Sequence, residues 1–523
     1  MNRTPMNESL PEGRLSPWVF AVASIYFLLH MLTATRYGYF RDALYYLACS
    51  EHLAWGYVDQ PPLIAALAWV ARHTLGTSLR ALLFWPALAG TARIVLTAAF
   101  ARELGARRFG TVLAAVLSAT PPVWYVIDHQ FAMNALEPLF WTGSAYVILR
   151  MIKTGNARLW LAFGAISGLG LQNKYSIAVF AFGLLAGLLL TPQRKLLFTP
   201  WLFAGGGAAL LIFMPNLLWN IRHHWPFLEL MHNIRTSGKD VALAPLAYLW
   251  QQILMAGPFS FPFWFGGLLF YLFSRHAKPY RVFGWAFVIT IAFFLMAHGK
   301  DYYSAPAYAV VLAAGAVAAE RFLAAPLLDA RPRLRLILKP LAFAWLLAGV
   351  LLILPVILPI LPIDGFLKFQ EHLPIHSART ECSQIGAALP QYYADEFNWP
   401  EMVQAVARVY HKLTPEEQVK TGIFTDNYGE AAAIDFFGPK YGLPKAISGH
   451  QNYFLWGPRN YTGEIVIRVG AAIEDVKSGY ENVTVAATIE NPYALYYETR
   501  PILLCRRRKE NYQTQWAKVK KWE

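Results

Sequence analysis

Five polar stretches carry the side chains that chemistry requires, and each lies where a long apolar run ends. The first, RYGYFRDALYYLACSEHLAWGYVDQPPL (36–63), contains Asp42 and Asp59. In the second, IDHQFAMNALEPLFW (127–141), Asn134 and Glu137 are three residues apart and share one face if the stretch from Met133 is helical. The other three contribute mostly cations: LGLQNKYSIA (169–178) has Lys174, NLLWNIRHHWPF (216–227) has Arg222 and His224, and MAHGKDYYSAPAY (296–308) has Lys300, Asp301 and Tyr302.

A carboxylate and several cations at a membrane boundary suit the transfer of a sugar from a lipid phosphate. The leaving phosphate must be held by Lys, Arg or a divalent metal as the glycosidic bond breaks, and the acceptor hydroxyl needs a base. Each stretch taken alone is more simply explained by charged and aromatic residues that anchor helix ends at the interface. Lys174 is harder to explain in this way, because a lysine between two apolar runs needs a partner or a water-filled cavity.

The runs between these stretches indicate an integral membrane protein. Of 523 residues, 56% are hydrophobic and 15% are charged, against roughly 25% charged residues in an ordinary soluble domain. Runs of about 20 apolar residues recur, and each can cross a hydrocarbon core of about 30 Å as a helix. The first run lacks a following small-residue cleavage site and is expected to stay as a spanning helix. Basic loops between the runs explain the net charge of +14 better than nucleic acid binding does.

We expect about eleven transmembrane helices, which make residues 1–364 an α-helical polytopic membrane domain. The expected spans are 17–35, 80–100, 109–127, 131–150, 159–173, 175–190, 200–218, 246–272, 282–297, 304–322 and 340–361. Lys and Arg concentrate in every second connection, and by the positive-inside rule these connections face the cytoplasm. The N-terminus is then cytoplasmic, and the polar stretches and the C-terminal region lie on the extracytoplasmic face of the cell (inner) membrane.

Residues 365–523 are expected to form a small extracytoplasmic α/β domain. The β-type segments GIFTD, GEIVIRVG, NVTVAATIE and PILLC alternate with helix-like runs such as WPEMVQAVARVYHKL. Of the three cysteines, Cys49 is expected to be unpaired. Cys382 and Cys505 form a disulfide or remain free thiols, and the sequence leaves both alternatives equally open.

In combination, the polar stretches resemble those of the GT-C glycosyltransferases. RDALYYLACSEHLAWGYVDQPPL is similar to the first outer loop of the protein O-mannosyltransferases, the aminoarabinose transferase of lipid A and the Rgt-type sugar transferases, where a D-E-x-Y-Y pattern precedes G-Y-x-D-x-P-P-L. The likeness continues through FAMNALEPLFW, NKYSIA, PNLLWNIRHHWPF and HGKDYYSAPAYAVVLAAG, and so covers about residues 17–322. It implies a transferase that uses a sugar on a polyprenyl phosphate.

The resemblance also implies roles for single residues. Asp42 corresponds to the acidic residue regarded as catalytic in the superfamily, with Glu137 as a second catalytic candidate. The residues expected at the donor phosphate are Lys174, Lys300, Tyr302 and Arg222. The residues expected at the substrates are Asp59, Asn134, His224 and Asp301.

The sequence departs from the family pattern at two carboxylates. The Glu that usually follows the first Asp is Ala43 here, and many relatives have an Asp where this chain has Asn134, so Glu137 is expected to substitute. A divalent metal such as Mg or Mn is therefore left open, with the cations as the alternative way to hold the phosphate. Asp59, followed by two prolines, also fits a turn or a helix cap.

Two other classes of protein remain as alternatives. A secondary transporter would also be a helical bundle with rare charges, but its site would lie near mid-membrane between repeated halves, and the sequence has no such repeat. A non-catalytic membrane scaffold that displays the α/β domain is the other. We expect a glycosyltransferase that moves one sugar from a polyprenyl-phosphate donor to a hydroxyl of a protein, a lipid or a glycan by direct displacement at the anomeric carbon, with inversion.

Overall fold

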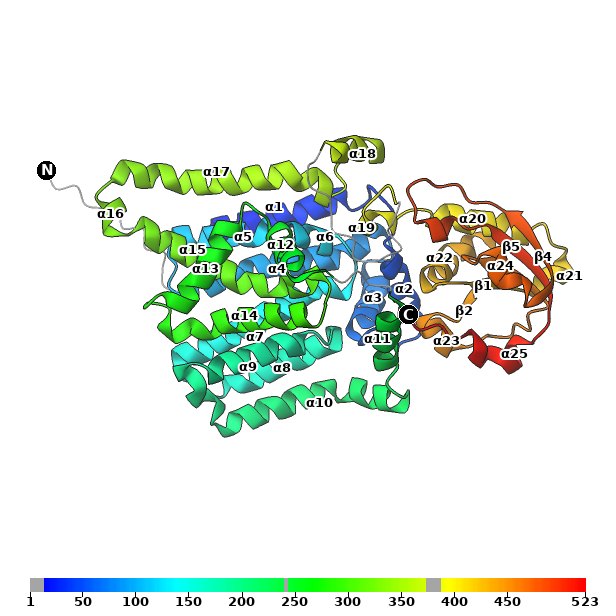
Figure 1. Cartoon of the computed structure of the whole chain (residues 1–523), viewed down its shortest axis with the longest axis horizontal. Helices are drawn as coiled ribbons and strands as arrows, with labels where there is room; N and C mark the ends of the chain where they lie inside the picture. Colours follow the sequence, from blue (N-terminus) through cyan, green and yellow to red (C-terminus); the bar gives the residue numbers. More distant parts are fainter. Residues whose placement is uncertain (1–13, 239–242, 373–386) are drawn as a thin grey trace.

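The computed structural model describes residues 14–238, 243–372 and 387–523. A long bundle of apolar helices occupies one end of the molecule and an α/β domain the other (Figure 1). The bundle helices are α1 (Pro17–Thr33), α4 (Leu79–Glu103), α5 (Arg108–Ala119), α6 (Pro122–Ile127), α7 (Met133–Thr154), α8 (Leu159–Asn173), α9 (Ile177–Leu189), α10 (Pro200–Arg222), α12 (Pro245–Ala256), α13 (Phe261–Phe273), α14 (Arg281–Met296), α15 (Tyr308–Leu323) and α17 (Pro332–Ile357).

All eleven apolar runs expected to span the membrane contain helix in the structure. Five segments have both the length and the hydropathy of a spanning helix, namely α4, α10, α14 with the turn before it, α15 with the turn before it, and α17. The run expected as one span over 246–272 is instead a pair, α12 and α13, bent by 111°. Gly257 causes the break, because its φ of +90° cannot continue an α-helix. These helices indicate an integral membrane protein. The number of eleven transmembrane helices stays a prediction.

Small residues let neighbouring bundle helices approach closely. A Cβ placed on Gly164 of α8 would lie 2.0 Å from the carbonyl oxygen of Gly205 on α10, so only glycine fits there. Gly267 of α13 has the same relationship to α15, where a Cβ would lie 2.0 Å from the carbonyl oxygen of Val311. Membrane helices associate through such close packing, since lipid provides no hydrophobic driving force between them.

The two ends of the bundle differ in charge. At one end, Glu103 accepts hydrogen bonds from Arg150 (2.8 Å) and Lys153 (2.7 Å), and Glu320 accepts from the backbone N–H groups of Arg107 and Gly110. These residues belong to the basic connections singled out in the sequence, and we call this the basic end. The opposite end, next to the α/β domain, is the domain end, and the five polar stretches meet there.

Short helices at the domain end join the bundle to the α/β domain. They are α2 (Arg41–Glu51), α3 (Leu63–Thr74), α11 (Pro226–Ser237), α18 (Ile363–Glu371) and α19 (Gln391–Ala394). The buried core of α2 and α3 is continuous with that of the α/β domain, because Leu44, Leu47 and Cys49 belong to the same apolar cluster as Val406 and Ile434. Helix α2 of the first polar stretch is therefore packed beneath the domain (Figure 1).

The α/β domain is built on a five-stranded mixed sheet of order β2-β1-β3-β5-β4. The strands are β1 (Thr421–Thr425), β2 (Ile447–Ser448), β3 (Ile465–Val469), β4 (Tyr480–Ala487) and β5 (Ile502–Arg508), and β1 is parallel to both of its neighbours. The helices are α20 (Trp399–Tyr410), α21 (Pro415–Val419), α22 (Tyr428–Phe437), α23 (Gln451–Trp456), α24 (Ile473–Lys477) and α25 (Tyr512–Gln515). Short 3-10 turns complete the chain: η1 (Pro192–Leu197), η2 (Lys278–Tyr280), η3 (Asp301–Ala307), η5 (Gly438–Tyr441), η6 (Tyr496–Thr499) and η7 (Trp516–Val519).

Each of the four segments read as β-type from the sequence contains a strand, and α20 forms where a helix was expected. Cys505 is buried in β5, whereas Cys382 lies outside the described residues, so the possible disulfide between them stays a prediction.

Candidate active site at the domain end of the bundle

Lys174 is the centre of the first group of polar residues. It follows the last residue of α8, and its ammonium donates to the Asn134 amide oxygen (2.7 Å) and to the Glu137 carboxylate (3.1 Å) on the first turns of α7. The expected shared face of Asn134 and Glu137 is confirmed by these two bonds. Ser176 donates to the other Glu137 oxygen, so both oxygens of this buried carboxylate are occupied.

Two tyrosine rings of the late polar stretch lie against the same ammonium. The Lys174 nitrogen lies 4.6 Å from the ring centroid of Tyr303 and 5.9 Å from that of Tyr302. An ammonium over an aromatic face is attracted by the ring quadrupole. An ammonium has three N–H donors, and two of them serve Asn134 and Glu137. Among the described residues, no hydrogen-bond acceptor is seen for the third.

The rest of the late stretch is held by its own short turn. Lys300 immediately precedes the 3-10 turn η3, and both it and Asp301 are half-buried. The Asp301 carboxylate accepts from the backbone N–H of Tyr302 (2.9 Å), and its carbonyl accepts from Gln252 of α12 (3.0 Å). The bend between α12 and α13 thus brings Gln252 to this stretch.

Asp42 is the centre of a second group, on the first turn of α2. Its Oδ1 accepts a hydrogen bond of 2.8 Å from the hydroxyl of Tyr428, the first residue of α22 in the α/β domain. The Nε of Arg41 lies 3.7 Å from the same Asp42 oxygen, and the Nη2 of Arg41 lies 3.4 Å from the Asp395 carboxylate. The Asp42 side chain is 28% exposed, so a ligand can reach it.

The first polar stretch connects the two groups. The Asp59 Oδ1 accepts from the hydroxyl of Tyr45 (3.0 Å), whose ring packs on Tyr428 with centroids 4.6 Å apart. On the other side, Asn216 joins the carbonyl of Trp55 to the hydroxyl of Tyr175, which is next to Lys174 in the chain. The structure therefore brings Asp42, Asp59 and Lys174 to one end of the bundle through a series of tyrosines.

Arg222 and His224, expected at the donor and at the substrate, end α10 on exposed surface. The inward face of α10 is formed instead by two asparagines. Asn216 accepts from Tyr175 (3.0 Å) and donates to the carbonyl of Trp55 (2.8 Å), and Asn220 donates to the Tyr175 hydroxyl (3.2 Å). The spacing of four in NLLWN was a signal for this pair, because residues i and i+4 share one helix face.

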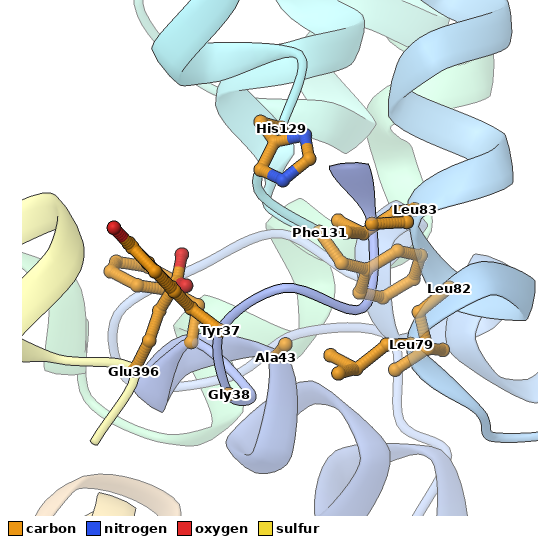
Figure 2. A pocket seen from close by; sticks show the side chains of 11 residues that line it. Tyr37, Gly38, Ala43, Leu79, Leu82, Leu83, His129, Phe131 and Glu396 are labelled. Carbon is orange, nitrogen blue, oxygen red and sulfur yellow. The ribbon is translucent and has the colours of Figure 1, made fainter. Parts of the chain in front are cut away.

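A small hollow of about 10 Å³ lies behind α2, next to Ala43. Figure 2 shows Leu79, Leu82 and Leu83 on one side of it, His129 and Phe131 above, and Tyr37 and Glu396 on the other side. Ala43, where the sequence departs from the family pattern, leaves part of this space open. Burial, and secondly the neighbouring Asp395, raise the pKa of the Glu396 carboxyl well above its usual range.

Buried carboxyl groups outnumber the cations around Arg41. Burial raises the pKa of Glu498 well above its usual range, and the nearby Asp395 raises it further. Burial and Asp426 raise the pKa of Glu430 to about 8. These groups therefore retain protons near neutral pH, which avoids the cost of several buried negative charges.

Asp128 and His129 of the second polar stretch are buried inside the bundle. Asp128 forms a 2.9 Å ion pair with the buried Arg93 of α4 and accepts from Tyr26 (2.7 Å). The ring nitrogens of His129 and His30 are 3.2 Å apart. The Arg93 guanidinium also lies 3.6 Å from the Trp124 ring, so this network connects α1, α4 and α6.

We tested whether the site residues fit a divalent metal. Among residues 14–238, 243–372 and 387–523, no group of three or more His, Cys, Asp or Glu side chains converges as a metal site would require. Asn134 and Glu137 direct their oxygens at the Lys174 ammonium. This donor set fits an ammonium, and no step through a metal is derived.

Three residues that contact the candidate site residues were not among the predicted site residues. Tyr428 lies 386 positions from Asp42, and no spacing connects the two. Tyr303 lies nearer to Lys174 than the expected Tyr302 does, and the adjacent tyrosines in KDYYS were the available signal. Ser176 follows Lys174 by two residues in NKYSIA, where a serine in an apolar run was the signal.

Parts of this chain are similar in sequence to known proteins. The family model described as dolichyl-phosphate-mannose-protein mannosyltransferase matches residues 59–219. The lipopolysaccharide core galacturonosyltransferase RgtB of Rhizobium johnstonii is 28% identical over 239 residues, which are 45% of this chain and 47% of the relative. The lipid A galacturonosyltransferase RgtD of the same organism is 26% identical over 198 residues, 37% of this chain and 41% of the relative. The matched region thus spans less than half the length of these curated relatives.

The fold is that of a solved membrane transferase. The crystal structure of ArnT from Cupriavidus metallidurans bound to undecaprenyl phosphate superposes with a TM-score of 0.58 and 14% sequence identity, over 93% of this chain and 98% of that one. At this identity the likeness concerns the fold. Together the comparisons show that this chain is similar to membrane-associated sugar transferases, as its polar stretches indicated.

Proposed function

We propose that the protein is a glycosyltransferase that moves a single sugar from a polyprenyl phosphate to a hydroxyl group. The observation that carries this proposal is the placement of one accessible carboxylate, Asp42, at the same end of the bundle as the Lys174 ammonium. The comparisons support it, because RgtB and RgtD are named as galacturonosyltransferases and the ArnT structure contains undecaprenyl phosphate.

In the proposed reaction Asp42 accepts the proton of the acceptor hydroxyl while that oxygen attacks the anomeric carbon. The bond from the anomeric carbon to the phosphate oxygen breaks, and one displacement inverts the configuration. Lys174 stabilises the leaving phosphate through its remaining N–H donor, with Lys300 and Tyr302 completing the pocket. Glu137 then acts by holding Lys174 in place, since both of its oxygens are already occupied.

The remaining roles follow from position. Asp59 orders the tyrosines between the two groups, and Asn134 supports the ammonium. Asp301 shapes the late turn, and exposed Arg222 and His224 are placed to meet a lipid head group at the surface. The basic end faces the cytoplasm under the positive-inside rule, so the reaction takes place on the extracytoplasmic face, with residues 365–523 forming an outer domain.

The test is transfer by purified protein reconstituted in liposomes. Labelled polyprenyl-phosphate sugars, including galacturonic acid, are offered with lipid A and lipopolysaccharide core as first acceptors. Wild type should transfer label, Asp42→Asn should lose at least a hundredfold in rate, and Asp475→Asn, an exposed acid on α24, should be unaffected. Undiminished transfer by Asp42→Asn would remove Asp42 from its proposed role, and no transfer by wild type with any donor would remove the proposal.

A further inference from the structure

Tyr428 of the α/β domain contacts the proposed base directly. Its hydroxyl donates to Oδ1 of Asp42 at 2.8 Å, across the junction between the domain and the bundle. Among the described residues, Tyr428 and Arg41 contact the Asp42 carboxylate, and both contacts are with Oδ1. Oδ2 therefore remains for an acceptor hydroxyl.

Tyr428 is held from several directions. Its ring packs on Tyr45 (4.6 Å) and on His450 (5.0 Å), and the Arg41 guanidinium lies 5.5 Å from it. Its backbone N–H donates to Nδ1 of His450 (3.3 Å). A side chain fixed in this way delivers its hydrogen bond in one orientation and loses little entropy in doing so.

The backbone that presents Tyr428 is equally well defined. Asn427 and Glu430 form a reciprocal capping box that starts α22 directly at Tyr428. This start lies at the carboxyl end of β1, between its parallel neighbours β2 and β3. Parallel sheets place functional residues at such carboxyl ends, where the strand order changes direction. Here that edge of the sheet faces α2 of the bundle (Figure 1).

The chemical state of Tyr428 suits a donor. Burial raises the pKa of Tyr428 well above its usual value, and the Asp42 carboxylate raises it further against the influence of Arg41. The hydroxyl therefore keeps its proton at physiological pH. A hydrogen bond from a neutral hydroxyl to a carboxylate stabilises the charged form of the carboxylate.

We propose that Tyr428 is a positioning residue for Asp42, so that the α/β domain completes the active site. Tyr428 fixes the plane of the Asp42 carboxylate, with Oδ2 directed to the acceptor. This inference rests on the proposed function, in which Asp42 is the base.

The experiment compares Tyr428→Phe with wild type in the reconstituted transfer assay. We expect kcat to fall about tenfold, KM for the lipid donor to stay within twofold, and the acid limb of the pH profile of kcat/KM to move to higher pH. A purely structural role would not move that limb. The matched control is Tyr461→Phe, which removes a hydroxyl bonded to the Lys445 carbonyl in the same domain and should leave the rate and the profile unchanged.

A second substitution keeps the test valid if Tyr428→Phe folds poorly. Incorporation of 3-fluorotyrosine at position 428 preserves the ring and the hydroxyl but makes the hydroxyl a stronger donor, so the acid limb should move to lower pH. If Asp42→Asn abolishes transfer but neither substitution at position 428 changes the pH profile, the role of Tyr428 is overturned and that of Asp42 is not. Absence of transfer in wild type overturns the proposed function instead.

Discussion

Lys174 and Glu137 form an ion pair with the ammonium 3.1 Å from the carboxylate, at the domain end of α7 and α8. The pair is largely buried, with side-chain exposures of 13% and 4%. Removing one partner of such a pair leaves an uncompensated charge and costs about 3–5 kcal/mol. The pair therefore has a structural value that is separate from any contact with phosphate.

Lys174→Met should therefore lower both stability and donor binding. We expect a loss of about 3–5 kcal/mol in unfolding free energy, seen as a lower unfolding temperature in detergent, together with a KM for the lipid donor raised at least tenfold. Both effects follow from one missing ammonium, so this variant alone does not separate them.

Adding Glu137→Gln to Lys174→Met separates the two effects. The double variant has no unpaired buried charge, so its unfolding temperature should return most of the way to that of wild type while donor binding stays weak. Glu137→Gln alone should keep donor binding, because the ammonium remains and loses a competing anion. Recovery of donor binding in the double variant would show that Lys174 does not contact the phosphate.

A second prediction concerns the ion pair inside the bundle. Asp128→Asn should destabilise the protein by about 3–5 kcal/mol, because Arg93 is then left buried without a counter-charge. The rate of transfer per folded molecule should not change, since neither residue lies in the Asp42 or Lys174 group. Thermal unfolding and kcat on the same preparations check this. Glu103→Gln at the basic end, whose partners are more than a third exposed, serves as the control and should cost no more than about 1 kcal/mol.

Local patterns in the sequence predicted much of this structure. Apolar runs predicted the helices, because a membrane helix must satisfy its backbone internally over a fixed length. The spacing of Asn134 and Glu137 predicted that they share one helix face, and the β-type segments GIFTD and GEIVIRVG predicted the strands that contain them. The bend between α12 and α13 was missed although Gly257 and Pro258 mark it, because hydropathy is averaged across such breaks.

Contacts between distant segments could not be predicted from the sequence. Tyr428 and Asp42 meet only because α2 packs under α22, and no local rule places one domain on another. The interior position of Asp128 was missed for the same reason. A charged residue at the end of an apolar run can be an interface anchor or a member of a buried ion pair. The position of Arg93 on another helix shows that Asp128 belongs to a buried ion pair.

A third prediction concerns the pH dependence of the α/β domain. The pKa of Glu430 is raised by burial from 4.5 to about 8, so the folded state holds a proton that the unfolded state has already lost between these values. Stability should therefore decrease as the pH rises from about 4.5 to about 8, by on the order of 4 kcal/mol from this residue. Buried Glu498, whose pKa is also raised, acts in the same direction.

Glu430→Gln tests this dependence with little change in shape. Gln keeps the oxygen that accepts from the backbone N–H groups of Asp426 and Asn427, so the start of α22 is preserved. Hydrogen exchange of the α22 amides across pH 5 to 8 should show a clearly smaller slope for this variant than for wild type. Glu464→Gln, at an exposed pair with Lys420, should leave the slope as it is. An equal slope for Glu430→Gln and wild type would assign the dependence to other groups.

The last prediction concerns the contact between α22 and α2. A Cβ on Gly429 would lie 2.4 Å from Cγ and 2.9 Å from Cδ of Arg41, so Gly429→Ala forces the two helices apart or displaces Arg41. Overpacking of this kind costs about 1–3 kcal/mol. The substitution should also lengthen the hydrogen bond between Tyr428 and Asp42. We expect kcat to fall about tenfold with donor KM unchanged, because small misplacements at a reacting centre have large kinetic effects.

The control is Gly479→Ala, where the nearest heavy atom is 3.6 Å away and φ is not positive. If Gly429→Ala folds and transfers sugar at the wild-type rate, the position of α22 on α2 does not matter for catalysis.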